Sequence, residues 1–184
     1  MSGICKPERT SATYGGDMSE SRAANGTHTT DGRPNGFSTL TPFLAVSPAR
    51  DAIAFYCDVF GATVIGTTEF GGLVSHAELD LGNGRLQLGE PSPDYHLAAQ
   101  STTDDACYSI ALYCPDVDAV VEKAVAAGAT VREPATDFVS GDRFASIRDP
   151  FGVRWSILTR VVDLSDAESA ARVAEWAAQF SSGS

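Results

Sequence analysis

The strongest constraint on the fold is an internal repeat. Short motifs such as Gly61-Ala62-Thr63-Val64 return later in the chain as Gly128-Ala129-Thr130-Val131, at matching distances from their neighbours. Four matched segments in the same order indicate two copies of one supersecondary unit. The matched segments are residues 44–46 with 112–114, 51–53 with 118–120, 61–64 with 128–131, and 77–88 with 145–157.

Each copy has the same pattern of expected elements. A β-rich run (residues 40–46 and 108–114) leads to a proline, Pro48 or Pro115, which favours the first turn of a helix. The helix runs to a glycine suited to the C′ position, and a strand and a hairpin complete the unit. The sequence therefore predicts an α+β fold made of paired βαβββ modules.

The hairpin of the first copy predicts which side chains share a face. A two-residue turn at Asn83-Gly84 places Asp80 opposite Gln87 and Leu81 opposite Leu86. Because side chains alternate along a strand, His76, Glu78, Asp80 and Gln87 lie on one face and the leucines on the other. We expect the leucine face to pack on the helix. In the same way, Thr41 and Phe43 of the first strand, and Ser109 and Tyr113 of the fifth, face away from the helices.

The chain divides into three parts. Residues 1–36 are rich in Ser, Thr, Gly and Asn, and we expect a disordered tail. Residues 37–162 form the folded domain, with modules at about 38–90 and 106–160. Residues 163–184 are expected to form a C-terminal helix, because Ser165 and Glu168 make a capping box.

The net charge of −11 lies on the domain, since four basic and four acidic groups cancel in residues 1–36. Negative potential repels phosphate backbones and anionic lipid surfaces, so we expect neither a nucleic-acid partner nor a membrane. No apolar run is long enough to span a bilayer, and no signal peptide is recognisable. We therefore expect a soluble, cytoplasmic protein with free thiols.

Several motifs stand out in the two modules. They are residues 41–46, 52–56 with 60–62, 76–79, 141–144 and 148–156, of which the Asp149-Pro150-Phe151-Gly152-Val153-Arg154-Trp155 run is the most specific. These motifs resemble the vicinal oxygen chelate superfamily of glyoxalase, bleomycin resistance and dioxygenase proteins, and its PhnB-like branch in particular. The resemblance covers about residues 38–160.

The resemblance implies a U-shaped, eight-stranded sheet around a cavity, with the helices on the outer face. Metal-dependent members carry His, Glu or Gln ligands at four positions, which correspond to Thr41, Gln87, Ser109 and Ser156. Three neutral hydroxyls and one amide do not make a divalent site. We therefore expect no metal and no other cofactor.

The candidate site residues follow from the strand faces and from the resemblance. His76 and Glu78 are the catalytic candidates, since one could act as a general base and the other could tune it; the simpler reading is a solvated strand face. Arg143 either reaches an anionic ligand or pairs with Asp142 or Asp149, and Arg148 and Arg154 stabilise the turn between them. The predicted ligand-binding residues are Thr41, Phe43, His76, Glu78, Gln87, Ser109, Tyr113, Arg143 and Ser156.

Two functions fit these expectations. The first is a metal-independent small-molecule-binding protein that sequesters a toxic or biosynthetic compound, and the resemblance implies a homodimer. The alternative is a glyoxalase-like lyase or isomerase that uses His76 and Glu78 or a divalent metal recruited by them.

Overall fold

The computed structural model describes residues 22–181, which fall into two compact units that end and begin at Gly36 and Phe37. The first unit contains a small hairpin, β1 (Thr29–Thr30) and β2 (Arg33–Pro34). Asp31 and Gly32 both have positive φ, as a tight hairpin turn requires. Residues 22–36 thus contain regular structure where none was expected, while residues 1–21 of the expected disordered tail lie outside the described part.

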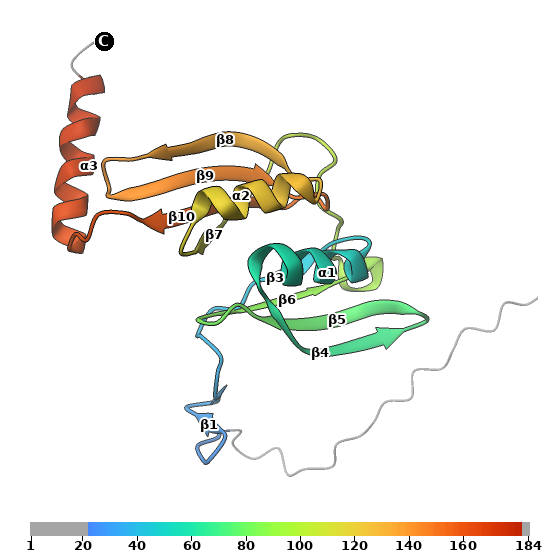
Figure 1. The fold of residues 1–184 in the computed structure, drawn as a ribbon. Coiled ribbons are helices and arrows are strands. Elements are labelled where there is room, and N and C mark those ends of the chain that lie inside the picture. The colour runs from blue at the N-terminus through green and yellow to red at the C-terminus, as the bar shows by residue number, and fades with distance from the viewer. Residues whose placement is uncertain (1–21, 182–184) are drawn as a thin grey trace, which may run out of the picture. The chain divides into compact units, whose positions relative to one another are not determined.

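The second unit has the predicted α+β composition and two βαβββ modules (Figure 1). A 3-10 turn, η1 (Pro93–Tyr95), lies between the modules, and helix α3 (Asp166–Ser181) follows the second one. The first module contains β3 (Phe43–Ala45), α1 (Ala49–Phe60), β4 (Thr63–Phe70), β5 (Leu73–Asp80) and β6 (Arg85–Gly89). The second contains β7 (Ile110–Tyr113), α2 (Val117–Ala126), β8 (Thr130–Asp137), β9 (Asp142–Arg148) and β10 (Arg154–Arg160).

The strands form two four-stranded sheets in these modules, ordered β3-β6-β5-β4 and β7-β10-β9-β8. In each sheet the first strand pairs in parallel with the last strand of its module, and the other pairs are antiparallel. The expected single eight-stranded sheet would require ladder hydrogen bonds between the modules. The ladder hydrogen bonds instead join strands of the same module.

Local signals set the helix ends, and those at Gly61 and at Ser165 with Glu168 were predicted. Gly61 ends α1 in the left-handed conformation, at φ 70°, and its N–H donates to the carbonyl of Tyr56. Asp116 caps α2, because its side chain accepts a hydrogen bond from the N–H of Ala119. Ser165 and Glu168 form the predicted capping box of α3: the N–H of Ser165 donates to Oε2 of Glu168 at 2.9 Å.

Both α1 and α2 lie between the two sheets, so the modules share one core (Figure 1). Helix α1 packs on β4 and β5, α2 packs on β8, β9 and β10, and the two helices touch. Tyr56 and Phe60 of α1 also contact Trp155 of β10, with ring centroids 5.4 and 4.7 Å apart. The helices are therefore inside this arrangement, whereas the family resemblance implied that they would lie outside the sheet.

The hairpin of β5 and β6 has a four-residue loop instead of the expected two-residue turn. Glu78 lies opposite Gln87 and Leu79 opposite Leu86, and Leu81 donates its N–H to the carbonyl of Gly84. The predicted register was wrong by two residues. A shift of two leaves the alternation of side chains unchanged, so the predicted faces are still those observed.

Helix α3 packs at one end of the second sheet. Trp176 meets Phe138 edge to face, with ring centroids 5.1 Å apart, and Ser169 Oγ donates to the carbonyl of Ser140. The last residues of the predicted helical segment, 182–184, lie outside the described part. Within residues 22–181, no helix is long and apolar enough to cross a membrane.

Candidate functional site

Each sheet has one face that points away from the helices, and the predicted site residues are distributed over these two faces. On the first sheet, Phe43 pairs with Gln87 and Gln87 with Glu78, so all three share a face. His76, two residues before Glu78, lies on it as well. We call this surface the first outer face, and its side chains include those of Phe43, His76, Glu78, Asp80, Arg85 and Gln87.

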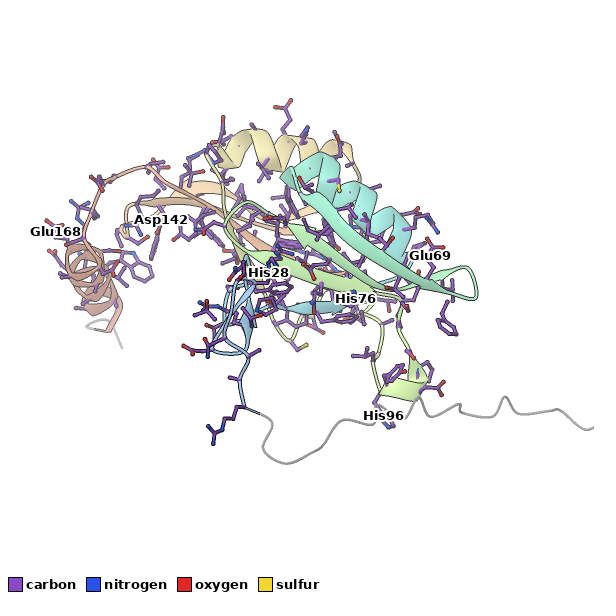
Figure 2. The ribbon with its side chains drawn as sticks, turned by 90° about the horizontal axis from the view of Figure 1, so that it is seen from below. His28, Glu69, His76, His96, Asp142 and Glu168 are labelled. Atoms are coloured by element: carbon purple, nitrogen blue, oxygen red, sulfur yellow. The ribbon has the colours of Figure 1, made fainter. Side chains whose placement is uncertain are left out.

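His76 lies against an aromatic ring on the first outer face. Its ring centroid is 6.0 Å from that of Phe43, with an angle of 34° between the planes. Figure 2 shows His76 on this sheet and His96 apart from it, on the loop that carries η1. The predicted neighbours Phe43, His76 and Gln87 are thus brought together, and Thr41 precedes Phe43 at the edge of the same sheet.

Glu78 is held in an ion pair with Arg85, which the sequence analysis missed. The two side chains are only 15% and 14% exposed, and the guanidinium of Arg85 lies over the ring of Phe37, 4.6 Å from its centroid. Arg85 thus engages the carboxylate that was one of the two candidates for a general base. The four-residue loop brings Arg85 opposite Asp80 and diagonally opposite Glu78.

The second outer face belongs to the β7-β10-β9-β8 sheet. Ser156 pairs with Ala111 on one side and with Ser146 on the other, so these positions share the face. Ser109 and Ser156 meet there, with their hydroxyl oxygens 2.8 Å apart. The face is made of Ser109, Ala111, Tyr113, Phe144, Ser146, Arg148, Arg154, Ser156 and Leu158.

Arg154 has a different role from the expected stabilisation of the turn. Its Nε donates to Oγ of Ser146 at 2.6 Å, and its Nη2 donates to Oε1 of Glu133 at 3.0 Å. Ser146 is 2% exposed, so the guanidinium is anchored on a buried hydroxyl. The alternation of side chains along the strand could have predicted that Arg154 lies beside Ser156, because one residue separates the two on β10.

The second outer face contains two hollows that share Glu133 and Phe144 in their walls. The smaller, of about 300 Å³, has a lining that is half polar and includes the Ser109–Ser156 pair. The larger, of about 590 Å³, is mainly apolar. The smaller is lined by Ala106, Cys107, Tyr108, Ser109, Glu133, Phe144, Ser146, Arg154 and Ser156. The larger is lined by Glu133, Pro134, Thr136, Asp137, Phe138, Ser140, Asp142, Phe144 and Leu158.

Tyr113 lies at the end of the second outer face where Asp142 is buried. Its hydroxyl is 3.5 Å from Oδ1 of Asp142, to which Arg160 Nε is bound at 2.8 Å. A hydrogen bond with Tyr113, together with the charge of Asp142, raises the pKa of Arg160. Figure 2 shows Asp142 at the end of the sheet nearest to α3.

Arg143 lies on the opposite side of this sheet from Ser156. It forms two hydrogen bonds with Asp118 of α2, at 2.7 and 2.8 Å, and one with Asp137 at 2.9 Å. Hydrogen bonding to Arg143 holds the pKa of Asp118 below its usual value. Arg143 thus pairs with carboxylates, as one of the two expectations predicted. Its partners are Asp118 and Asp137 instead of Asp142 or Asp149.

The four positions that would hold a metal in metal-dependent relatives do not fit one here. Ser109 and Ser156 use their hydroxyls on each other, and Thr41 and Gln87 belong to the other sheet. These groups are neutral, whereas a divalent ion prefers carboxylate, imidazole or thiolate ligands. Among residues 22–181, no three or more His, Cys, Asp or Glu side chains are grouped so that they could hold an ion.

The two outer faces point away from each other, because the helices occupy the space between the sheets (Figure 1). Thr41, Phe43, His76, Glu78 and Gln87 therefore belong to one face. Ser109, Tyr113 and Ser156 belong to the other. A single chain does not unite the predicted site residues.

Comparison with known proteins identifies the family. The model of the Glyoxalase/Bleomycin resistance protein/Dioxygenase superfamily matches residues 36–157. An uncharacterized protein of Mycobacterium bovis is 33% identical over 138 residues, which cover 71% of this chain and 90% of that protein.

Solved structures agree with this match. TioX from a Micromonospora species has a TM-score of 0.54 and 25% identity, and the alignment covers 67% of this chain and 98% of TioX. A PhnB protein from Bacillus cereus has a TM-score of 0.53 and 19% identity, with 66% and 99% covered. The chain belongs to the glyoxalase/bleomycin resistance protein/dioxygenase superfamily.

Proposed function

We propose that the protein binds a small molecule on its outer sheet faces without the help of a metal ion. The observation that carries this proposal is the second outer face, where two adjoining hollows combine a hydroxyl pair with an apolar wall. Ligand pockets commonly have this composition, with a few polar groups that orient a ligand in an apolar surface. Sequestration of a toxic or biosynthetic compound is the role that fits such a site.

We further propose that the working form is a homodimer. Each outer face is open on the side away from the helices, so one chain supplies only one wall of a cavity. A second copy can place its first outer face over the second outer face of its partner. The groups Phe43, His76 and Gln87 would then complete the site that contains Ser109 and Ser156.

Three measurements on the full chain, purified without chelator, test this proposal. Sedimentation should give the mass of two chains, and elemental analysis should find no stoichiometric Ni, Zn, Mn or Fe. Denaturation of the protein should release a bound small molecule, which mass spectrometry then detects. A single-chain mass would contradict the dimer, and one metal per chain would contradict metal independence.

A pair of matched variants locates the binding. Ser156→Trp fills the smaller hollow and should prevent recovery of the bound molecule. Ser47→Trp adds the same side chain at an exposed position before α1 and should leave recovery unchanged. Equal recovery from both variants would move the site away from the second outer face.

The enzymatic alternative depends on His76. Since Arg85 engages Glu78, His76 would have to act without that carboxylate as its partner. Replacement of His76 by Ala should alter affinity if the protein only binds its ligand. Complete loss of turnover of an identified substrate, with unchanged affinity, would favour the lyase or isomerase.

We propose the cytoplasm as the location, because Cys57, Cys107 and Cys114 are free thiols, as a reducing compartment permits. Cell fractionation with an antibody against the domain tests this location. Recovery of the protein in a secreted or membrane fraction would contradict it.

A further inference from the structure

We propose that the second outer face binds an elongated, mainly apolar molecule that carries a carboxylate at one end. The carboxylate lies in the smaller hollow, at Ser109, Ser156 and Arg154, and the apolar part extends along Phe144 into the larger hollow. This assignment rests on the proposed small-molecule-binding function and specifies the chemistry of its ligand.

The smaller hollow offers hydrogen-bond donors to a ligand. Within the Ser109–Ser156 pair, one hydroxyl hydrogen is used between the two oxygens, which leaves the other hydroxyl hydrogen for a ligand. Arg154 has five N–H donors, and its contacts with Ser146 and Glu133 account for two of them. A planar guanidinium with donors to spare is well suited to a carboxylate.

The local charge also favours an anion, although the whole chain has a net charge of −11. Arg148 is the cross-strand neighbour of Arg154 on the same face. Like charges directly opposite each other destabilise a sheet, so this arrangement has a cost that an anionic ligand would offset. In the described part of the chain, the guanidinium of Arg148 donates to the uncharged carbonyl of Ser101. The carboxylate of Glu133 pairs with Arg154 and not with Arg148.

The larger hollow suits the apolar part of the ligand. Its wall includes Pro134, Phe138, Phe144 and Leu158. Two other carboxylates line this wall: Asp142 is paired with Arg160, whereas Asp137 shares Arg143 with Asp118. The remaining negative charge disfavours an anionic group in the larger hollow, so the carboxylate of the ligand is favoured at the Arg154 end.

Helix α3 limits the apolar end of the site. Trp176 holds Phe138 through the edge-to-face contact, and Phe138 is part of the wall of the larger hollow. Trp176 is therefore a positioning residue that determines how long a ligand can be. The superfamily match ends at residue 157, so α3 lies beyond it.

The test uses a fluorescent probe, 11-(dansylamino)undecanoic acid, titrated into the full-length protein. The acid should bind roughly tenfold or more tightly than its methyl ester, because the ester lacks the charge that Arg154 recognises. An amine-terminated dansyl probe of equal length should bind more weakly than both. Equal affinity for acid and ester would overturn the assignment of a carboxylate.

Two variants test the polar end. Arg154→Gln should lower affinity for the acid by roughly tenfold and leave affinity for the ester almost unchanged. Arg50→Gln is the matched control, since Arg50 belongs to the first module, where it pairs with Glu69. Thermal unfolding establishes that both variants are folded. An Arg154→Gln variant that binds the acid as tightly as the original protein would overturn the proposal.

A third variant tests the apolar end. Trp176→Ala should weaken binding of the undecanoic acid probe but leave the binding of dansylglycine, which is too short to reach Phe138, unchanged. A merely structural role would change both to the same extent, and that result would overturn the assignment of Trp176.

Failure of this inference can be told apart from failure of the proposed function. If a small molecule is released from the isolated protein but none of the dansyl probes binds, the ligand class is wrong and the binding function stands. If the isolated protein releases no molecule and binds no probe, both are wrong.

Discussion

Asp149 is a buried carboxylate that joins the two modules. Its Oδ2 accepts hydrogen bonds from the Tyr56 hydroxyl at 2.7 Å and from Trp155 Nε1 at 2.9 Å. Its Oδ1 accepts from the N–H groups of Phe151 and Val153, both at 2.9 Å. Burial raises the pKa of Asp149, and the hydrogen bonds from these partners oppose that shift. Four donors on one side chain fix the turn of the second module against α1.

Asp149→Asn should therefore destabilise the domain. An amide supplies one acceptor oxygen where the carboxylate has two, so at least one buried donor loses its partner. We expect a loss of about 1–3 kcal/mol in the free energy of unfolding. Urea unfolding measures it, with Asp58→Asn, at an exposed position of α1, as the control. A loss no larger than that of the control would contradict the role of Asp149.

The raised pKa of Asp149 gives the same variant a pH dependence. The folded state holds the proton of this carboxyl more tightly than the unfolded state does, so its protonation stabilises the fold. That contribution is complete below the unfolded pKa, about 3.8, and is lost as the pH rises through the folded value. The stability deficit of Asp149→Asn should thus shrink between pH 3.5 and pH 7. A deficit that grows with pH would contradict the direction of the shift.

At the scale of single elements, the end of β6 approaches β5 very closely. A Cβ atom at Gly89 would meet the backbone of Ser75, with its carbonyl carbon 2.9 Å away, and also the ring of Phe43. Gly84, in the loop of the same hairpin, has open space around its Cα. Gly84 and Gly89, in the same hairpin, therefore serve different purposes.

Gly89→Ala should destabilise the first module by about 1–3 kcal/mol, because backbone atoms must move to admit the methyl group. Gly84→Ala is the matched control and should change stability little. Chemical denaturation of both variants measures the difference. Equal stability of the two would show that the strands can separate without cost.

The elements themselves were largely predictable from the sequence, because their signals are local. Gly61 and the Ser165–Glu168 box mark helix ends with a φ angle or side chains that the nearby backbone requires. The hairpin register was not predictable, since the loop length depends on hydrogen bonds of Gly82 and Leu81 that the turn motif does not specify. The faces were predicted because the error was an even number of residues.

The candidate site was predicted in part for the same reason. Strand alternation placed Phe43, His76 and Gln87 on one face and Ser109 and Ser156 on another. The partners of Glu78 and Arg143, which are Arg85 and Asp118, depend on distances between elements. No spacing in the sequence contains that information.

At the scale of the whole molecule, the two modules share a single aromatic core. Tyr56, Phe60 and Phe55 of α1 contact Trp155 and Phe151 of the second module, and the buried apolar residues form one cluster. This packing joins residues far apart in the sequence, and it was not predictable from the repeat. Each module alone would expose the side of its helix that the other module covers.

We therefore expect the modules to unfold together. Thermal unfolding of the full chain should show one transition that is the same by tryptophan fluorescence, which reports mainly on the second module, and by far-ultraviolet circular dichroism. Two separate transitions would contradict the shared core. Residues 37–104, produced alone, should lack a cooperative transition, and the full chain serves as the control.

The position of the helices between the sheets has an evolutionary consequence. The hydrophobic core is made of α1, α2 and the inward sides of the sheets, whereas the side chains that we propose to contact a ligand lie on the outward sides. Mutations on the outward sides can alter what is bound with little effect on folding. Selection can therefore diversify the binding chemistry of such a chain while its core sequence remains unchanged.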